Sequence, residues 1–139
     1  MKNFFDIIAP IYERIHFGAK KTFKKIESIT DFQSSDNVLD LGGGTGRISR
    51  FLANRVEKIV VVDSSQKMIE GCKKHAGLLC VFAQAEGLPF PKQSFNKIIV
   101  IDAFHHFQNQ KQVVKPNNDI LPAPLPKLTS PNNGKLILC

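Results

Sequence analysis

Apolar residues follow two different periods along this chain. Over 3–16 and 19–29 they recur at helical spacing, with Gly18 between the segments, so we expect two N-terminal helices. Four later runs are short, continuously apolar and mostly β-branched, at 37–41, 58–63, 78–83 and 96–102. Such runs are typical of strands buried on both faces of a parallel sheet.

Helix-like segments separate these predicted strands. They cover residues 45–55 and 65–75, and the second follows Asp63-Ser64-Ser65, which supplies candidate capping residues. Strand alternating with helix predicts an α/β fold. We expect a doubly wound, mostly parallel sheet of about five strands, preceded by the N-terminal helices.

The last quarter of the chain has a different composition. Five of the eight prolines fall between residues 116 and 131, a density that excludes a long helix. Residues 134–139 (GKLILC) predict one more strand after a turn. The length of 139 residues fits a single domain, which we divide into an N-terminal helical cap (1–31), a core (32–115) and a proline-rich connection with the last strand (116–139).

The formal net charge of +7 is spread along the chain, with an excess of +2 in residues 1–31, +4 in 32–115 and +1 in 116–139. This distribution argues against a dedicated nucleic-acid surface. Only four lysines cluster, at positions 20, 21, 24 and 25, and that spacing is typical of a solvated helix face. Contact with RNA or an anionic lipid is the alternative for this cluster.

Cysteine usage and hydropathy bear on location. Cys72, Cys80 and Cys139 are odd in number and lack paired CxxC spacing, so we expect reduced, mostly buried thiols of a cytoplasmic protein and no metal site. The longest aliphatic runs are strand-sized, so we expect no membrane insertion.

The sequence VLDLGGGTGRIS (38–49) is the strongest candidate site. A glycine-rich turn between strand and helix lets a ligand approach the main chain. The dinucleotide pattern G-x-G-x-x-G fails, because Arg47 and Ser49 stand where its third glycine would fall. The pattern present is acid-x-Gly-x-Gly-x-Gly, and a carboxylate at the strand end suits an ammonium or sulfonium ligand better than a pyrophosphate.

Five segments together resemble the class I S-adenosylmethionine-dependent methyltransferases, most of all the ubiquinone/menaquinone biosynthesis C-methyltransferase branch (methyltransferase type 11). They are FFDIIAPIYE (4–13), VLDLGGGTG (38–46), VVVDSSQKMIE (60–70), AQAEGLPFPKQSFNKIIVIDAFHHF (83–107) and NGKLIL (133–138). Their order and spacing match those of the family. The resemblance implies a Rossmann-like fold and S-adenosyl-L-methionine as cofactor.

The resemblance also implies roles for the residues around the loop. Gly42, Gly44 and Gly46 would let the methionine and ribose portions lie against the backbone, and Asp40 would hold the methionine ammonium. Asp63 would accept hydrogen bonds from both ribose hydroxyls. Ser64 and Met68 follow it, Met68 packing on the adenine face or, alternatively, serving only as helix core.

Residues farther along complete the implied cofactor site. Gln84 stands where the family usually has an acid for the adenine amino group, and Ala85 would offer its backbone N–H to the base. Asp102 and Ala103 would line the methionine side. Tyr12 would cap the cofactor, with simple packing as the alternative.

His105 and His106 are our candidates for catalysis. They form an adjacent ionisable pair suited to proton transfer near neutral pH, so either could act as general base toward the methyl acceptor. The alternative is one packed and one solvated histidine at a helix start.

We therefore expect methyl transfer from S-adenosyl-L-methionine to a small-molecule acceptor. The chain has neither the Asn/Asp-Pro-Pro-Tyr/Phe motif of amino-group methylation nor the Pro-Cys motif of cytosine C5 methylation after its fourth strand, so a nucleic-acid substrate is disfavoured. Compared with the family, the C-terminal β-hairpin is missing, and the last strand should expose an edge through which a homodimer could form. The alternatives are a cofactor-binding domain with little turnover, an NAD-binding Rossmann-like protein and an RNA-associated module.

Overall fold

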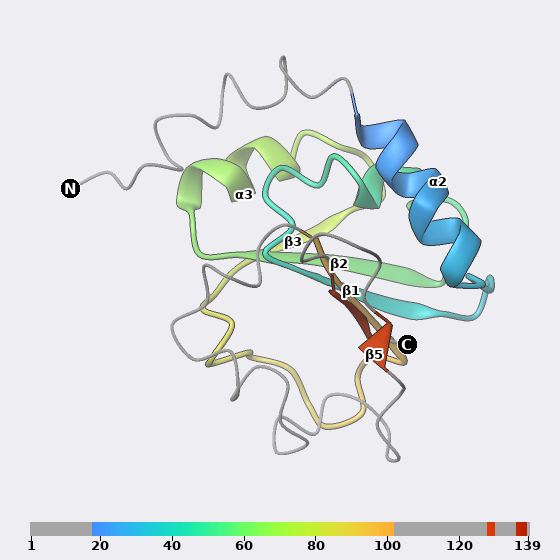
Figure 1. Cartoon of the computed structure of the whole chain (residues 1–139). Helices are drawn as coiled ribbons and strands as arrows, with labels where there is room; N and C mark the ends of the chain where they lie inside the picture. The colour runs from blue at the N-terminus through green and yellow to red at the C-terminus, as the bar shows by residue number, and fades with distance from the viewer. Residues whose placement is uncertain (1–17, 102–127, 130–135, 139) are drawn as a thin grey trace.

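The structure, a computed structural model, describes residues 18–101 and two short strands at 128–129 and 136–138 (Figure 1). Its elements in chain order are α2 (Ala19–Ile29), β1 (Asn37–Leu41), the 3₁₀ helix η1 (Ser49–Phe51), β2 (Lys58–Asp63), α3 (Gln66–Cys72), β3 (Leu79–Phe82), β4 (Lys97–Val100), β5 (Leu128–Thr129) and β6 (Leu136–Leu138). The predicted first helix, at 3–16, lies outside the described residues.

The strands form one sheet in the order β3-β2-β1-β4-β6-β5. The first four are parallel, whereas β6 pairs antiparallel with both β4 and β5. This confirms the predicted Rossmann-like, mostly parallel α/β sheet. β2 and β3 lie on one side of β1, and β4 lies on the other side. The order in which successive strands join the sheet therefore reverses at β1. In open α/β sheets ligands bind at the carboxyl ends of the strands near such a reversal.

Different segments bury the two faces of the sheet. Phe23 and Ile26 of α2 pack in one apolar cluster with Val38, Ile59 and Ile99 of three neighbouring strands. Figure 1 shows α3 on the same side of the sheet as α2. The opposite face is covered by the segment between β3 and β4, whose buried residues include Ala85 and Phe95.

The two described α-helices have clear boundaries. α2 covers the predicted residues, and the Thr30 N–H ends it with a bond to the Ile26 carbonyl. α3 is shorter than the predicted 65–75. It begins at the cap Ser65, whose hydroxyl accepts from the Met68 N–H, and the chain then turns through Gly77 at φ 80°.

The predicted helix at 45–55 is wrong, since the structure has only η1 and turns there. The N–H groups of Phe51, Leu52 and Arg55 donate to carbonyls three residues earlier, which is the tighter 3₁₀ pattern. Ser49, which lies in this segment, donates its hydroxyl to Asp40 of β1. A serine that bonds away from its own helix gives that helix little support.

The prediction that every strand is buried on both faces holds for β1, β2 and β4 but is wrong for β3. Leu79 and Phe82 are each 54% exposed. The reason is topological, because β3 lies at the edge of the described sheet and pairs there with β2 alone. Strand edges are exposed whatever their composition.

The predicted exposed last strand is also wrong. β6 lies between β4 and β5, because the proline-rich segment contributes a further two-residue strand, Leu128–Thr129. The edges of the described sheet are therefore β3 and β5. The expected homodimer through an exposed last strand loses its premise.

Two of the three cysteines are joined rather than reduced. Cys72 at the end of α3 and Cys80 in β3 form a disulfide, with their Cα atoms 6.1 Å apart. The crossover from β2 through α3 to the parallel β3 brings them together, although eight positions separate them in sequence. The prediction of reduced thiols is thus wrong for this pair, and Cys139 lies outside the described residues.

Candidate functional site

The glycine loop follows β1 and turns sharply at every second residue. Gly42, Gly44 and Gly46 have φ values of 71°, 61° and 76°, in the left-handed region that favours glycine. The alternating spacing seen in the sequence is therefore a requirement of the backbone. The loop is held to the sheet because the Gly42 and Gly43 N–H groups donate to the Val62 carbonyl at 2.7 and 3.2 Å.

Gly43 is required for a different reason, which the sequence analysis missed. A Cβ there would lie 2.5 Å from Asp40 Oδ2 and 2.8 Å from Val61 Cγ1. These contacts are too short for real atoms, so the loop can lie this close to the sheet only with glycine at 43. The available signal was the uninterrupted Gly-Gly-Gly run.

Asp40 lies beneath the loop and is almost fully buried, at 2% exposure. Its Oδ2 accepts a 2.5 Å hydrogen bond from the Ser49 hydroxyl. Burial raises the pKa of Asp40 to about 6; the Asp63 charge also raises it, whereas the Ser49 hydrogen bond and the Arg47 charge lower it. The carboxyl group thus serves the packing of the loop, and contact with an ammonium stays a prediction.

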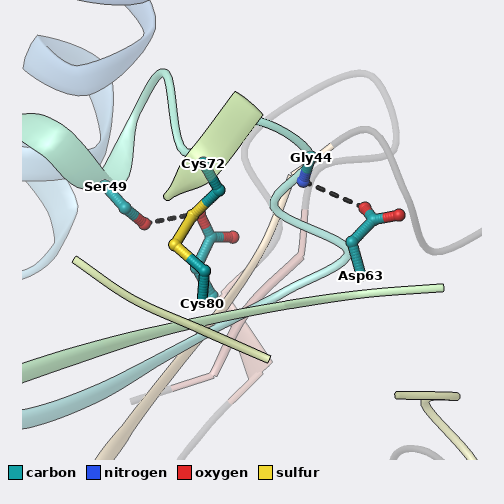
Figure 2. Close-up of a disulfide and its surroundings, with 6 residues drawn as sticks. Gly44, Ser49, Asp63, Cys72 and Cys80 are labelled. Atoms are coloured by element: carbon teal, nitrogen blue, oxygen red, sulfur yellow. Dashed lines mark hydrogen bonds between the residues drawn. A yellow bond between two sulfur atoms is a disulfide. The ribbon is translucent and has the colours of Figure 1, made fainter. Parts of the chain in front are cut away.

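Asp63, at the carboxyl end of β2, is the best-oriented acid of the site. Its Oδ2 accepts from the Gly44 N–H at 3.0 Å (Figure 2), and its Oδ1 accepts from the Ser65 N–H at 2.8 Å. The side chain is half-buried, and its neighbour Ser64 is exposed. Two backbone donors therefore fix a carboxylate at the edge of the sheet where a ligand would bind.

Met68 is 3% exposed and sits under the loop, since a Cβ on Gly44 would lie 3.6 Å from its Sδ. This position satisfies the helix-core role, and packing on adenine stays a prediction. Thr45 was missed by the sequence analysis. It is 1% exposed, and its hydroxyl has no hydrogen-bond partner among the described residues.

The end of β3 brings the predicted adenine-binding residues toward Asp63. The Ala83 N–H donates to the Asp63 carbonyl at 3.1 Å, continuing the β2–β3 pairing by one residue. Gln84 is exposed directly after it, whereas Ala85 is buried at 6%. An exposed amide at this edge is free of structural packing, so a ligand can reach it.

The remaining predicted site residues lie outside the described residues. They are Tyr12, Asp102, Ala103, His105 and His106. β4 runs parallel to β1 and ends at Val100, so the carboxyl ends of these two strands lie at the same edge of the sheet.

The glycine loop, Asp63 and Gln84 follow the carboxyl ends of β1, β2 and β3, and residues 38–121 match the methyltransferase domain family. The chain belongs to this family of S-adenosylmethionine-dependent methyltransferases, and its sequence is similar to those of the ubiquinone/menaquinone C-methyltransferases.

Two methyltransferases are similar in sequence over most of this chain. The chain is 30% identical over 123 residues to the ubiquinone/menaquinone biosynthesis C-methyltransferase UbiE of Wigglesworthia glossinidia brevipalpis, covering 76% of this chain and 49% of that protein. It is 32% identical over 121 residues to the demethylmenaquinone methyltransferase of Thermotoga maritima, covering 80% and 52%. The chain thus spans about half the length of these relatives.

A solved structure supports the same fold. The YcgJ protein of Bacillus subtilis superposes with a TM-score of 0.67 at 25% identity, covering 73% of this chain and 46% of that one. Within the part of the chain that the structure describes, no helix is long and apolar enough to cross a membrane.

Proposed function

We propose that this chain binds S-adenosyl-L-methionine along the carboxyl edge of β1, β2 and β3 and serves its methyl transfer to a small-molecule acceptor. The observation that carries the proposal is the Asp63 carboxylate, held by the Gly44 and Ser65 N–H groups beside a loop of three left-handed glycines. Membership of the methyltransferase family supports it.

Each residue has a role in this proposal. Asp63 accepts the two ribose hydroxyls, because an ionised carboxylate has two oxygens that can each accept more than one hydrogen bond. The glycines and Ala85 bring main-chain groups close to the ligand, Gln84 contacts the adenine amino group, and Met68 lies below. Ser64 lines the ribose side. Asp40 balances the positive charge of the methionine ammonium with its negative charge. Its pKa of about 6 means that the carboxyl group is mostly ionised at neutral pH.

The bound cofactor supplies an electrophilic methyl group on a sulfonium. The chain has to orient the acceptor and exclude water, and orientation alone can lower a barrier by about 7–11 kcal/mol. In our proposal Asp102 and Ala103 line the methionine side, and Tyr12 caps the cofactor. His105 or His106 removes the acceptor proton where the acceptor is a hydroxyl, phenol or carbon acid.

A cofactor-binding domain with little turnover is the second candidate. The proposed domain division, 1–31, 32–115 and 116–139, and location in the cytoplasm stay predictions of the sequence.

Calorimetric titration with S-adenosylmethionine and S-adenosylhomocysteine tests the proposal. Asp63→Ala should weaken binding by about 10- to 100-fold, the loss expected for charge-assisted hydrogen bonds. Glu70→Ala is the matched control, since Glu70 is an exposed acid of α3 that pairs only with the exposed Lys67 in the described structure. Equal binding by Asp63→Ala and wild type, or binding of NAD instead, would overturn the proposal.

If the cofactor binds, methyl transfer to a panel of phenol, hydroxyl and amine acceptors separates the two candidates. Turnover that His105→Ala or His106→Ala reduces at least about 100-fold supports the enzyme. Binding without any turnover supports the cofactor-binding domain.

A further inference from the structure

The glycine loop rests along one face of α3. A Cβ on Gly44 would lie 3.6 Å from Met68 Sδ, and a Cβ on Gly46 would lie 3.4 Å from Cys72 Sγ. Between them, a Cβ on Gly71 would lie 2.9 Å from Thr45 Cγ2. Positions 68, 71 and 72 share one side of a helix. The shape of the loop therefore depends on where α3 lies.

α3 has only seven residues, too few to be stable as a helix on its own. Its start is fixed by the Ser65 cap and by the Asp63 carboxylate. Its end is fixed covalently, because Cys72 is its last residue and is bonded to Cys80 of β3 (Figure 2). One end of the loop's support thus depends on a bond that can be reduced.

We propose that the Cys72–Cys80 pair is a redox-sensitive clamp that sets the affinity of the glycine-loop site for its cofactor. The inference rests on the proposed function. In the oxidised chain the disulfide holds the C-terminal end of α3 to β3, and in the reduced chain this covalent link is absent. A loop without this support has to become ordered when the cofactor binds. That ordering costs conformational entropy, so the affinity for the cofactor falls.

The two cysteine residues differ in exposure. Cys72 is fully buried, whereas Cys80 is partly exposed on the edge strand β3. In the proposed exchange a small thiol such as glutathione attacks at Cys80, the more exposed residue of the pair. The glutathione thiolate bonds to Cys80 Sγ and the Cys72 sulfur leaves as a thiolate that takes up a proton.

A second glutathione completes the exchange. Its thiolate attacks the glutathione sulfur of the mixed disulfide, releases Cys80 as a thiolate that takes up a proton, and leaves as glutathione disulfide. Two thiols are oxidised and one protein disulfide is reduced. Glutathione disulfide drives the same steps backwards.

The test uses the full chain carrying Cys139→Ser, so that only the two clamp cysteines react. Samples are equilibrated with glutathione disulfide or with glutathione, the thiols are counted by maleimide labelling and mass spectrometry, and S-adenosylhomocysteine is titrated calorimetrically. The oxidised form should bind at least about fivefold more tightly, the lower end of usual coupling between sites. The oxidised form should also show the higher midpoint of thermal unfolding.

Cys80→Ser in the same background should bind like the reduced chain under both conditions. If this variant does not fold, the comparison of one chain in two redox states still decides. Equal affinity of both states, or no Cys72–Cys80 bond under oxidising conditions, overturns the clamp and leaves the proposed function standing. If neither state binds the cofactor, both proposals fall.

Discussion

Gly43 is required by packing rather than by its own φ angle. Replacement by alanine places a Cβ against Asp40 and Val61, neither of which can move away easily inside the core. We expect Gly43→Ala to lower the free energy of unfolding by about 1–3 kcal/mol. Urea denaturation measures this.

Gly87→Ala is the matched control, because no atom lies within 4 Å of a Cβ at that position. It should leave the stability unchanged or raise it by up to about 1 kcal/mol. A similar loss in both variants would show that the close approach at Gly43 is not what destabilises the chain.

The buried Asp40 makes a second prediction at this scale. Its folded-state pKa of about 6 exceeds the unfolded value of 3.8, so Asp40 stays protonated to a higher pH in the folded chain than in the unfolded chain. Stability from this group is therefore lost as the pH rises from about 4 to about 6. Relative to wild type, Asp40→Asn should become more stable through this window, by about 3 kcal/mol at its upper end.

Urea denaturation of wild type and Asp40→Asn at a series of pH values from about 3.5 to about 7.5, below and above the two pKa values, measures this difference directly. A difference that does not change with pH would contradict the assignment to Asp40.

Asp36 should behave in the opposite way. Burial raises its pKa, but hydrogen bonds from Lys97, Gln33 and Asn96 outweigh that effect and hold the pKa below its ordinary value. Its contribution is present above pH 3.8 and is lost as the pH falls through the lower folded-state pKa. Asp36→Asn should therefore be less stable than wild type at pH 7, with the difference shrinking in acid.

At the scale of single elements, α3 depends most on its ends. The Ser65 hydroxyl accepts the Met68 N–H and so satisfies one of the first free donors of the helix. Ser65→Ala should cost about 1 kcal/mol of stability, measured by urea denaturation. The exposed neighbour Ser64 provides the control, and Ser64→Ala should change stability by less than about 0.5 kcal/mol. Equal effects would indicate that the cap is not formed.

The elements show how far the sequence could be interpreted. The β-branched runs predicted β1, β2 and β4 closely, and the 3.6-residue period predicted α2 at its observed bounds, because both signals are local. The segment 45–55 has apolar spacing that suits a helix, but Ser49 bonds to Asp40 instead. That competition depends on a residue in the neighbouring strand.

The same distinction applies to the site. The spacing of Gly42, Gly44 and Gly46 is a local requirement and was visible in the sequence. The need for Gly43 and the Cys72–Cys80 bond arise only when β2, α3 and β3 are placed side by side. The burial of Asp40 likewise depends on the loop closing over it.

At the scale of the whole molecule, β3 leaves an apolar edge uncovered in the described structure. An edge with exposed apolar side chains is a site for self-association. Phe82→Lys should reduce association at high concentration without lowering stability by more than about 1 kcal/mol, as judged by analytical ultracentrifugation and denaturation.

Ile29→Lys controls for added charge, because Ile29 is also exposed, at 41%, but ends a helix rather than lining a sheet edge. If both variants reduce association equally, net charge rather than the β3 edge governs it.

The contact between Thr45 and Gly71 joins two distant parts of the chain into one steric unit. Because a methyl group at 71 would occupy the space of the Thr45 methyl, the two positions can change together more easily than singly. Among diverging copies of this gene, an alanine at 71 should accompany serine or glycine at 45. The loop and the helix beneath it would then evolve together. The smaller residue at 45 should appear first, and alanine at 71 should follow, because the space for its methyl group exists only after the first change.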